Sequence, residues 1–329
     1  LLDPAVTRSV QTRTIGKVPY TPRCDAEGKV LDDGTVSRLG ETTFRLTAAE
    51  PNLRWLEMNA VGMDVLITDI SQAVAALSLQ GPKSRLVLNR CAERPLDALK
   101  YFRLMDNAIA GRPLTISRTG YTGDLGYEIW IPAEHALPVW DALIAAGQDF
   151  GLAPAGILAL DVARVEAGLI LIETDYTAAH HALIESQKSS PFELGLGWAV
   201  NLEKEHFNGK QALAAEKARG PEWMLVGLEV DWVGMERLYR EVGLPPQISP
   251  FTVRASLPVF SGGVQVGYAS SSAWSPVLKK YIALAHLQRP YFEVGTNLLL
   301  EVTVEHQRKF APARVRSEEH TSELQSPNT

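Results

Sequence analysis

Residues 117–168 constrain the fold more than any other part of the sequence. They begin with SRTGYTGDLGYEIWIP, in which large apolar and aromatic residues alternate with small and polar ones, as in a β-strand. The glycines of this run permit tight bends or the close approach of a flat group. The later stretch GLAPAGILALDVARVEAG predicts a helix that begins near Pro154 and ends at Gly168. This pairing of a glycine-rich strand with an amphipathic helix organises our interpretation of the chain.

The predicted helix has one feature that packing alone does not explain. Glu166 follows Ala159 and Ala163 at helical spacing, so a carboxylate lies in a row of small apolar side chains. A buried carboxylate is costly unless it accepts hydrogen bonds or meets a cation. Arg164, Arg118 or a ligand could meet that need, and the pattern alone does not choose among them. The neighbouring face is predicted to be buried through Leu158, Val162, Val165 and Leu169.

Composition excludes several classes of protein. A length of 329 residues indicates two or three domains, and no run of about 18 apolar residues is present to span a membrane. The net charge is -6, and no basic cluster is interleaved with aromatic residues, so we expect no nucleic-acid partner. The two cysteines, Cys24 and Cys91, cannot build a disulfide framework and fit a reducing compartment. We therefore expect a soluble, cytoplasmic protein.

Two ordered motifs carry a resemblance to a known family. SRTGYTGDLGYEI followed by GLAPAGILALDVARVEAGL resembles the core of the glycine cleavage system T-protein family, the tetrahydrofolate-dependent aminomethyltransferases. Related folate-dependent demethylases, and the folate half of sarcosine and dimethylglycine dehydrogenases, carry the same domain. SPFELGLGWAV, FNGKQAL and VGYASSSAWSPVLKKYIALA extend the resemblance. It implies an α+β fold, in which ferredoxin-like folate-binding domains precede a C-terminal antiparallel β-barrel in a cloverleaf arrangement.

The resemblance also implies domain boundaries. Residues 1–60 and 150–220 are predicted to form a discontinuous first folate-binding domain, which is truncated at its N-terminus relative to the family. Residues 61–149 are predicted to form a second ferredoxin-like domain, and residues 221–315 the barrel, where short strands alternate with glycine and proline. Residues 316–329, which include RSEEHTSELQS, resemble a translated sequencing adapter, and we expect them to be a non-native tail.

Local patterns predict the elements within these domains. The expected strands cover residues 17–23, 30–31, 35–39, 43–47, 64–70, 73–79 and 114–117, and the expected helices cover 51–60, 84–91 and 136–146. The pair Asp33-Gly34 between hydrophobic runs is by itself a hairpin signal. The family resemblance implies a different role, because T proteins carry a tyrosine, an N-E-x-G-G segment and a D-D pair in this order. The matching residues are Tyr20, the altered segment DAEGK and Asp33, and the resemblance makes Asp33 the catalytic residue.

The resemblance further implies a folate site. A reduced pterin presents an amino group and a ring N–H side by side, and a carboxylate accepts such a pair in the way it accepts a guanidinium. Glu166 is the implied acceptor, with Tyr20 and Tyr121 as walls and hydrogen-bond donors. Lys204 stands where some relatives carry an arginine near folate. The alternatives are an ion pair for Glu166 and ordinary half-buried strand positions for both tyrosines. Trp198 and Trp274 are expected to pack in the core.

The implied reaction is a one-carbon transfer to tetrahydrofolate. In the glycine cleavage reaction the donor is the aminomethyl group on the lipoylated H protein, and ammonia is released. Two alternatives remain open from the sequence. The first is a tetrahydrofolate-dependent demethylase or methyltransferase acting on a small N-, O- or S-methyl substrate, favoured by Ala49 and the DAEGK segment, which depart from the T-protein pattern. The second is a non-catalytic folate-binding protein, although its K-G-C-Y-x-G-Q-E signature is not found.

Residues 177–190 look like an insertion relative to the family. They contain His180 and His181, which raise the question of a metal site. Neighbouring histidines on a strand or loop point apart, and no further histidine or cysteine follows at ligand spacing. The sequence therefore predicts no metal.

Overall fold

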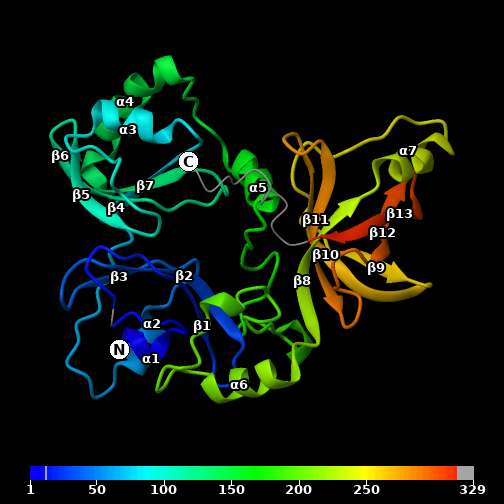
Figure 1. Ribbon diagram of the computed structural model, residues 1–329, viewed down its shortest axis with the longest axis horizontal. Coiled ribbons are helices and arrows are strands. Elements are labelled where there is room, and N and C mark those ends of the chain that lie inside the picture. The colour runs from blue at the N-terminus through cyan, green and yellow to red at the C-terminus, as the bar shows by residue number, and fades with distance from the viewer. Residues whose placement is uncertain (12, 317–329) are drawn as a thin grey trace.

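In the computed structural model, which describes residues 1–11 and 13–316, three sheets lie around the helix α5 (Ile157–Glu166) (Figure 1). The predicted tail lies outside the described residues except for Arg316, which ends the last strand. The first sheet is three-stranded and antiparallel in the order β1-β2-β3. Its strands and the helices grouped with it are β1 (Tyr20–Cys24), β2 (Val30–Arg38), β3 (Phe44–Leu46), α1 (Leu2–Ala5), α2 (Leu53–Asn59) and α6 (Lys210–Arg219) (Figure 1).

The pair Asp33-Gly34 lies inside β2, so the hairpin prediction at this position is wrong. The turn falls at residues 25–29, where Gly28 has a φ of 75° and donates its N–H to Asp25 O at 3.2 Å. A Cβ at position 34 would lie 2.2 Å from the Thr47 carbonyl oxygen. The glycine is therefore required by the close passage of the neighbouring chain and not by a turn.

The second sheet has four antiparallel strands in the order β4-β7-β6-β5, and α3 and α4 pack beside it. Its core joins Leu88 of α3 and Val139 of α4 to Ile116 and Ile129 of the sheet, and all four are fully buried. The elements are β4 (Val74–Gln80), α3 (Ser84–Cys91), β5 (Leu104–Ile109), β6 (Arg112–Ser117), β7 (Gly126–Pro132) and α4 (Ala136–Gly147). The strand predicted over 64–70 is wrong, because this segment is irregular and mostly exposed and pairs with no strand in the described part of the chain.

The third sheet closes into a barrel in the order β10-β11-β8-β13-β12-β9. Closure leaves no strand edge free along this ring. The elements are β8 (Trp223–Val230), α7 (Trp232–Arg240), β9 (Leu257–Ser261), β10 (Val264–Ser275), β11 (Lys280–Gln288), β12 (Asn297–Val304) and β13 (Gln307–Arg316). The expected fold class, an α+β chain with a C-terminal antiparallel barrel, is confirmed. Among the described residues, no helix is long and apolar enough to cross a membrane.

Helix α5 lies between the barrel and the rest of the molecule and contacts β10 and β11 (Figure 1). It ends as predicted, because Gly168 follows it with a φ of 71°, a conformation that glycine adopts freely. Its buried face differs from the prediction. Val165 is buried, but Leu158 is 47% exposed, and Asp161 and Arg164 are buried in its place. The buried side of this helix is therefore strongly polar.

Candidate functional site

Asp33 holds a carboxylate between two tyrosine hydroxyls. Tyr20 Oη donates to Asp33 Oδ2 at 2.8 Å, and Tyr176 Oη donates to Oδ1. The strand register explains the first contact. Asp33 pairs with Pro22 across the β1–β2 ladder, so Tyr20, two residues before Pro22, projects from the same face. Tyr176 reaches the carboxylate from the loop that follows α5. Two neutral donors from distant parts of the chain thus fix one acid.

Asp32 projects from the opposite face of β2 and is enclosed. Its Oδ2 lies 2.6 Å from Arg23 Nη2, and both side chains are 0% exposed. The same oxygen accepts from Asn52 Nδ2 at 2.9 Å and from the Glu50 N–H at 3.1 Å. A carboxylate paired in this way has a structural role, because removing one partner would leave an uncompensated buried charge. The adjacent aspartates therefore have different tasks.

Burial is the largest influence on the pKa of Asp33 and raises it above its ordinary value, with the Asp32 charge adding to the rise. The hydroxyls of Tyr176 and Tyr20 act in the opposite direction, because they stabilise the charged form. Burial and the Asp33 charge also raise the pKa of both tyrosines, which stay protonated donors at neutral pH. Asp33 is thus a more basic carboxylate than a surface aspartate, which suits it to accept a proton or to face a developing positive charge.

Tyr121 lies close to this cluster. Its hydroxyl donates to the Ile170 carbonyl oxygen, in the segment between α5 and Tyr176. Burial raises the pKa of Tyr121, and the negative charge of Asp33 raises it further. The charge of Asp33 is therefore felt at the Tyr121 hydroxyl. The glycine-rich run after β6 is therefore joined to the loop that carries Tyr176.

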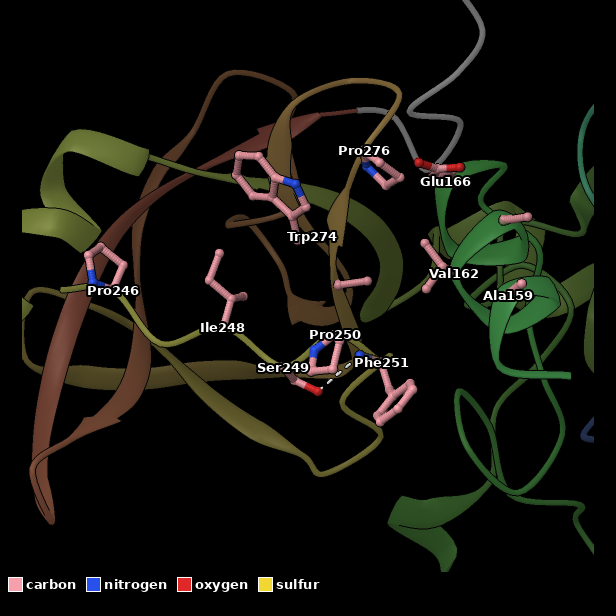
Figure 2. A pocket seen from close by; sticks show the side chains of 12 residues that line it. Ala159, Val162, Glu166, Pro246, Ile248, Ser249, Pro250, Phe251, Trp274 and Pro276 are labelled. Carbon is pink, nitrogen blue, oxygen red and sulfur yellow. Dashed lines mark hydrogen bonds between the residues drawn. The ribbon is translucent and has the colours of Figure 1, made fainter. Parts of the chain in front are cut away.

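Glu166 lines a cavity of about 630 Å³ between α5 and the barrel (Figure 2). This volume falls within the range of small-molecule sites, roughly 300–1,000 Å³. Glu166 Oε1 accepts from Ser275 Oγ, and Ser275 Oγ accepts from the Leu278 N–H at 2.9 Å. The predicted small-residue row is present, because Ala159 and Ala163 line the same cavity. The remaining walls are Val162, Pro246, Ile248, Ser249, Pro250, Phe251, Ala273, Trp274 and Pro276.

Arg164, one predicted partner of Glu166, instead centres a buried cluster of its own. Its Nε donates to Asp161 Oδ1 at 2.9 Å, its Nη1 donates to Asp175 Oδ2, and its Nη2 donates to Ser271 Oγ at 2.7 Å. Asp175 Oδ1 accepts from both Ser270 and Ser271 at 2.6 Å. This Arg164 cluster joins α5, the following loop and strand β10. Because Asp175 precedes Tyr176, the barrel helps to place a tyrosine that contacts Asp33.

Lys204 lies apart from these groups in its contacts. Its Nζ donates to the carbonyl oxygens of Asp3, Val6 and Arg8 and lies 3.6 Å from Asp3 Oδ2. The ammonium thus anchors the N-terminal segment, and a role in cofactor binding stays a prediction.

Several features were missed by sequence reasoning. Tyr176 lies in a non-periodic loop 143 residues from Asp33, and only the adjacent polar pair Asp175-Tyr176, in the segment that follows the predicted helix, hints at a role. Trp198 was expected in the core but is 60% exposed and stacks on Tyr20 with ring centroids 5.7 Å apart. Trp274 packs against the barrel core and also lines the Glu166 cavity. The histidine prediction is wrong in its premise, because the rings of His180 and His181 lie 4.1 Å apart.

The geometry supports chemistry on a bound small molecule. One carboxylate, Asp33, is raised in pKa and held by hydroxyls that keep their protons. Another, Glu166, borders an apolar cavity with an aromatic wall, which suits a flat ligand that donates hydrogen bonds. A held carboxylate with a raised pKa is suited to general acid–base catalysis, but Asp33, Tyr20 and Tyr121 are not among the residues that line this cavity.

Comparisons with known proteins agree on one family. The GCVT N-terminal domain family matches residues 1–204, and the glycine cleavage T-protein C-terminal barrel domain matches residues 240–319. A protein named aminomethyltransferase from Halalkalibacterium halodurans is 35% identical over 306 residues, which cover 92% of this chain and 76% of that protein. The Bacillus subtilis protein of the same name is 35% identical over 320 residues, which cover 95% of this chain and 80% of that protein.

Two further matches bear on fold and chemistry. The crystal structure of the glycine cleavage system aminomethyltransferase T from Bartonella henselae aligns with a TM-score of 0.79 at 25% identity, covering 97% of this chain and 80% of that one. A trimethylamine-oxide aldolase from Ruegeria pomeroyi is 35% identical over 322 residues, which cover 94% of this chain but 37% of that larger protein.

Proposed function

Because the chain belongs to the glycine cleavage T-protein family, we propose that it transfers a one-carbon unit to tetrahydrofolate with release of ammonia. The enzyme class is an aminomethyltransferase, the name carried by the Halalkalibacterium and Bacillus relatives and by the matching crystal structure. The demethylase and non-catalytic alternatives are not favoured by these relatives. The folate acceptor, the partner protein and the residue roles below are part of the proposal.

The observation that carries the proposal is the setting of Asp33. Its carboxylate touches two neutral hydroxyls, while the neighbouring Asp32 holds the buried guanidinium of Arg23. The pKa of Asp33 is raised by burial, so the group is a competent base. We assign Asp33 as the catalytic residue. It takes up or relays a proton, or stabilises the positive charge that develops as the one-carbon unit moves.

The residues around the Glu166 cavity fit tetrahydrofolate. A pterin offers an amino group and a ring N–H in one plane, which a carboxylate accepts together. Glu166 supplies that carboxylate, Trp274 supplies an aromatic wall, and Ala159 and Ala163 leave room for a flat ring. Tetrahydrofolate supplies the nucleophilic nitrogen that accepts the carbon. Tyr20 and Tyr121 do not line this cavity, and their role as further walls of the folate site stays part of the proposal.

The residues of this chain divide the remaining work. Tyr20 and Tyr176 hold both oxygens of Asp33 in place, so the carboxylate does not need to reorganise when charge develops. Lys204 is left out of this proposal, because its ammonium already binds three carbonyl oxygens.

The proposed partner is the lipoylated H protein of the glycine cleavage system, which would deliver the aminomethyl group. A cytoplasmic setting belongs to the same proposal, since Cys24 and Cys91 are free thiols. No part of the proposal requires a nucleic acid or a membrane.

A turnover assay tests the proposal. The protein is incubated with tetrahydrofolate and aminomethylated H protein, and ammonia and methylenetetrahydrofolate are followed together. We expect both products in equal amounts and only when both substrates are present. Ammonia release that does not depend on tetrahydrofolate, or folate binding without turnover on H protein, would contradict the assignment. The second result would turn attention to methylated amines.

A further inference from the structure

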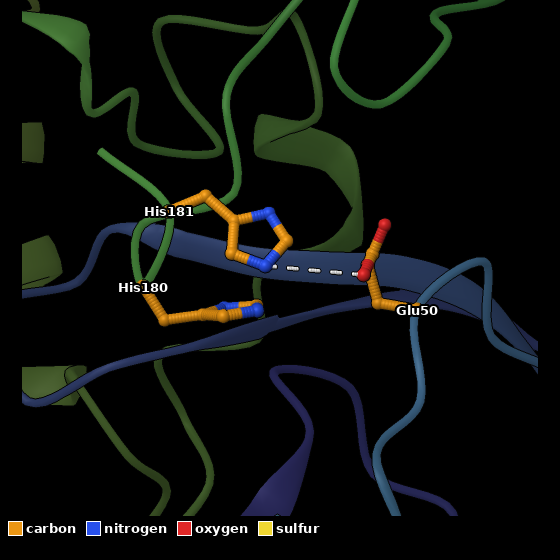
Figure 3. Close-up of side chains that lie close together, drawn as sticks. All are labelled: Glu50, His180 and His181. Carbon is orange, nitrogen blue, oxygen red and sulfur yellow. Dashed lines mark ion pairs between the residues drawn. The ribbon is translucent and has the colours of Figure 1, made fainter. Parts of the chain in front are cut away.

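Two loops bring three metal-ligating side chains together beside the Asp33 site. Glu50 follows β3, and His180 and His181 lie in the loop of residues 177–190. One ligand atom from each of the three lies within 4.8 Å of the others. The imidazole rings are 4.1 Å apart and inclined by 61°, and Figure 3 shows both histidines next to the Glu50 carboxylate. We call these residues the Glu50–His180–His181 group.

The backbone holds the two loops in register. The Ala179 N–H donates to Val30 O at 2.8 Å, and the Val30 N–H donates to Ser189 O at 2.9 Å, so β2 binds both ends of the histidine loop. On the other side, the Glu50 N–H donates to Asp32 Oδ2 at 3.1 Å. Both ligand-bearing segments are therefore anchored to β2. Their proximity is a property of the fold and not of long, freely moving side chains.

A fourth residue fixes the orientation of one histidine. His181 Nδ1 lies 3.1 Å from Glu173 Oε1, and because a carboxylate can only accept, Nδ1 carries the proton. Nε2 is then the nitrogen with the free lone pair, and it lies 4.0 Å from Glu50 Oε2. A carboxylate–histidine pair of this kind sets the tautomer and raises the basicity of a metal-binding imidazole. Glu173 is itself positioned by the Ala178 N–H at 3.0 Å.

The spacing suits a tetrahedral ion after a small closure. Bonds of about 2.0–2.1 Å to nitrogen and oxygen place tetrahedral ligands about 3.3 Å apart. The ligand atoms of the three side chains lie up to 4.8 Å apart, so they must approach one another to bind an ion. Rotation of the two histidine side chains allows this approach, because both are exposed. The 4.0 Å separation of His181 Nε2 and Glu50 Oε2 is too long for a hydrogen bond and leaves space between two potential ligands.

We propose that Glu50, His180 and His181 bind one divalent ion of the zinc type, with Glu173 orienting His181. Three protein ligands leave a fourth coordination position for water or a small donor ligand. The ion ties the 177–190 loop to the segment after β3, next to the carboxylates of β2. This inference does not depend on aminomethyl transfer.

Equilibrium metal binding to the full chain tests the site. The protein is stripped with a chelator and titrated with Zn²⁺ against a chromophoric competitor, and then with Co²⁺, whose absorption distinguishes tetrahedral from octahedral coordination. We expect one ion per chain and a tetrahedral cobalt spectrum. His181→Ala, His180→Ala and Glu50→Gln should each weaken binding by at least about 100-fold, and Glu173→Gln by about 10- to 100-fold.

The matched control is His206→Ala, which removes an exposed histidine outside the group. It should leave affinity and stoichiometry unchanged. Circular dichroism and thermal unfolding show that each variant is folded. Equal affinity in His181→Ala and His206→Ala, or an octahedral cobalt spectrum that the substitutions do not alter, would overturn the proposal. An unchanged affinity in Glu173→Gln would overturn the orienting role.

Discussion

The Arg164 cluster and the Asp33 site are both partly or wholly enclosed polar groups, but they are built on opposite principles. In the Arg164 cluster, one guanidinium faces Asp161 and Asp175, and the three side chains are between 0% and 4% exposed. In the Asp33 site, the carboxylate accepts hydrogen bonds from two tyrosine hydroxyls of the described chain and keeps partial exposure. Full charge pairing removes a group from chemistry, whereas neutral donors hold a group and leave its charge available.

The two regions are also joined by a single peptide bond. Asp175 belongs to the Arg164 cluster, and the next residue, Tyr176, binds Asp33. His286 of the barrel donates from Nε2 to the Asp175 carbonyl oxygen, and burial lowers its pKa, so it acts here as a neutral donor. The Arg164 cluster thus positions Tyr176, which is part of the Asp33 site.

The largest effect is expected on turnover when Asp33 of the Asp33 site is changed. Asp33→Asn removes the base and should lower turnover by about 100- to 10,000-fold, while the Kd for tetrahydrofolate changes little. Steady-state kinetics with H protein and calorimetry with folate measure the two quantities. Asp64→Asn, an exposed aspartate, is the control. Equal losses in turnover and folate binding would mean that Asp33 has a structural role, like the carboxylates of the Arg164 cluster.

Stability gives a second measure of the same variant. Because the pKa of folded Asp33 is raised above its unfolded value, ionisation disfavours folding as the pH rises through the unfolded and then the folded pKa. Asp33→Asn should therefore gain stability relative to wild type on going from acidic to neutral pH. Urea unfolding at both pH values checks the sign, and the reverse trend would contradict a raised pKa.

The next effect concerns the stability of the fold and the Arg164 cluster. Arg164→Ala leaves the buried Asp175 without a cation and Asp161 with only Arg254, and it should destabilise the fold by about 3–5 kcal/mol. The midpoint of urea denaturation measures it. Arg254→Ala is the matched control, since Arg254 Nε also contacts Asp161 at 2.9 Å but its side chain is 46% exposed. That control should cost about 1 kcal/mol or less. Similar losses in both would refute the assigned role of burial.

A smaller effect is expected for Glu166, whose described side-chain contact is a serine hydroxyl. If Glu166 accepts hydrogen bonds from folate, Glu166→Gln loses a charge-assisted interaction and should raise the Kd by about 10- to 100-fold. Calorimetry with tetrahydrofolate measures this change, and Glu134→Gln, at an exposed position, serves as control. An unchanged Kd would assign Glu166 to structure, like Asp161.

The smallest effect sharpens the role of the hydroxyls. Tyr176→Phe removes a donor that lowers the pKa of Asp33, so that pKa should rise further. The acid limb of the pH–rate profile should move to higher pH by about one unit or less, as expected for one neutral hydrogen bond. Tyr239→Phe, in the barrel region, is the control. A shift to lower pH would show that Tyr176 does not stabilise the carboxylate.

Local pattern was enough to predict much of the fold. The helices α3, α4 and α5 follow from periodicity and from turn residues close to each end, which are features of short windows. The site was harder, because its contacts span long separations. Asp33 looks like a hairpin residue until the strand pairing is known, and Leu158 fits a buried face only if α5 packs on an apolar neighbour. Its neighbour is instead polar, with Ser271 facing Arg164. Glu50 and the two histidines meet only because β2 binds both loops.

The bonding of Asp175 limits how this protein can be divided. Ser270, Ser271 and His286 of the barrel complete the surroundings of a residue that lies far earlier in the chain. A fragment that ends before β8 would expose that carboxylate and release Tyr176. Fragment expression, or exchange of the barrel between homologues, must therefore preserve both sides of this contact. The barrel and the loop after α5 therefore need to be kept together when the chain is cut or recombined.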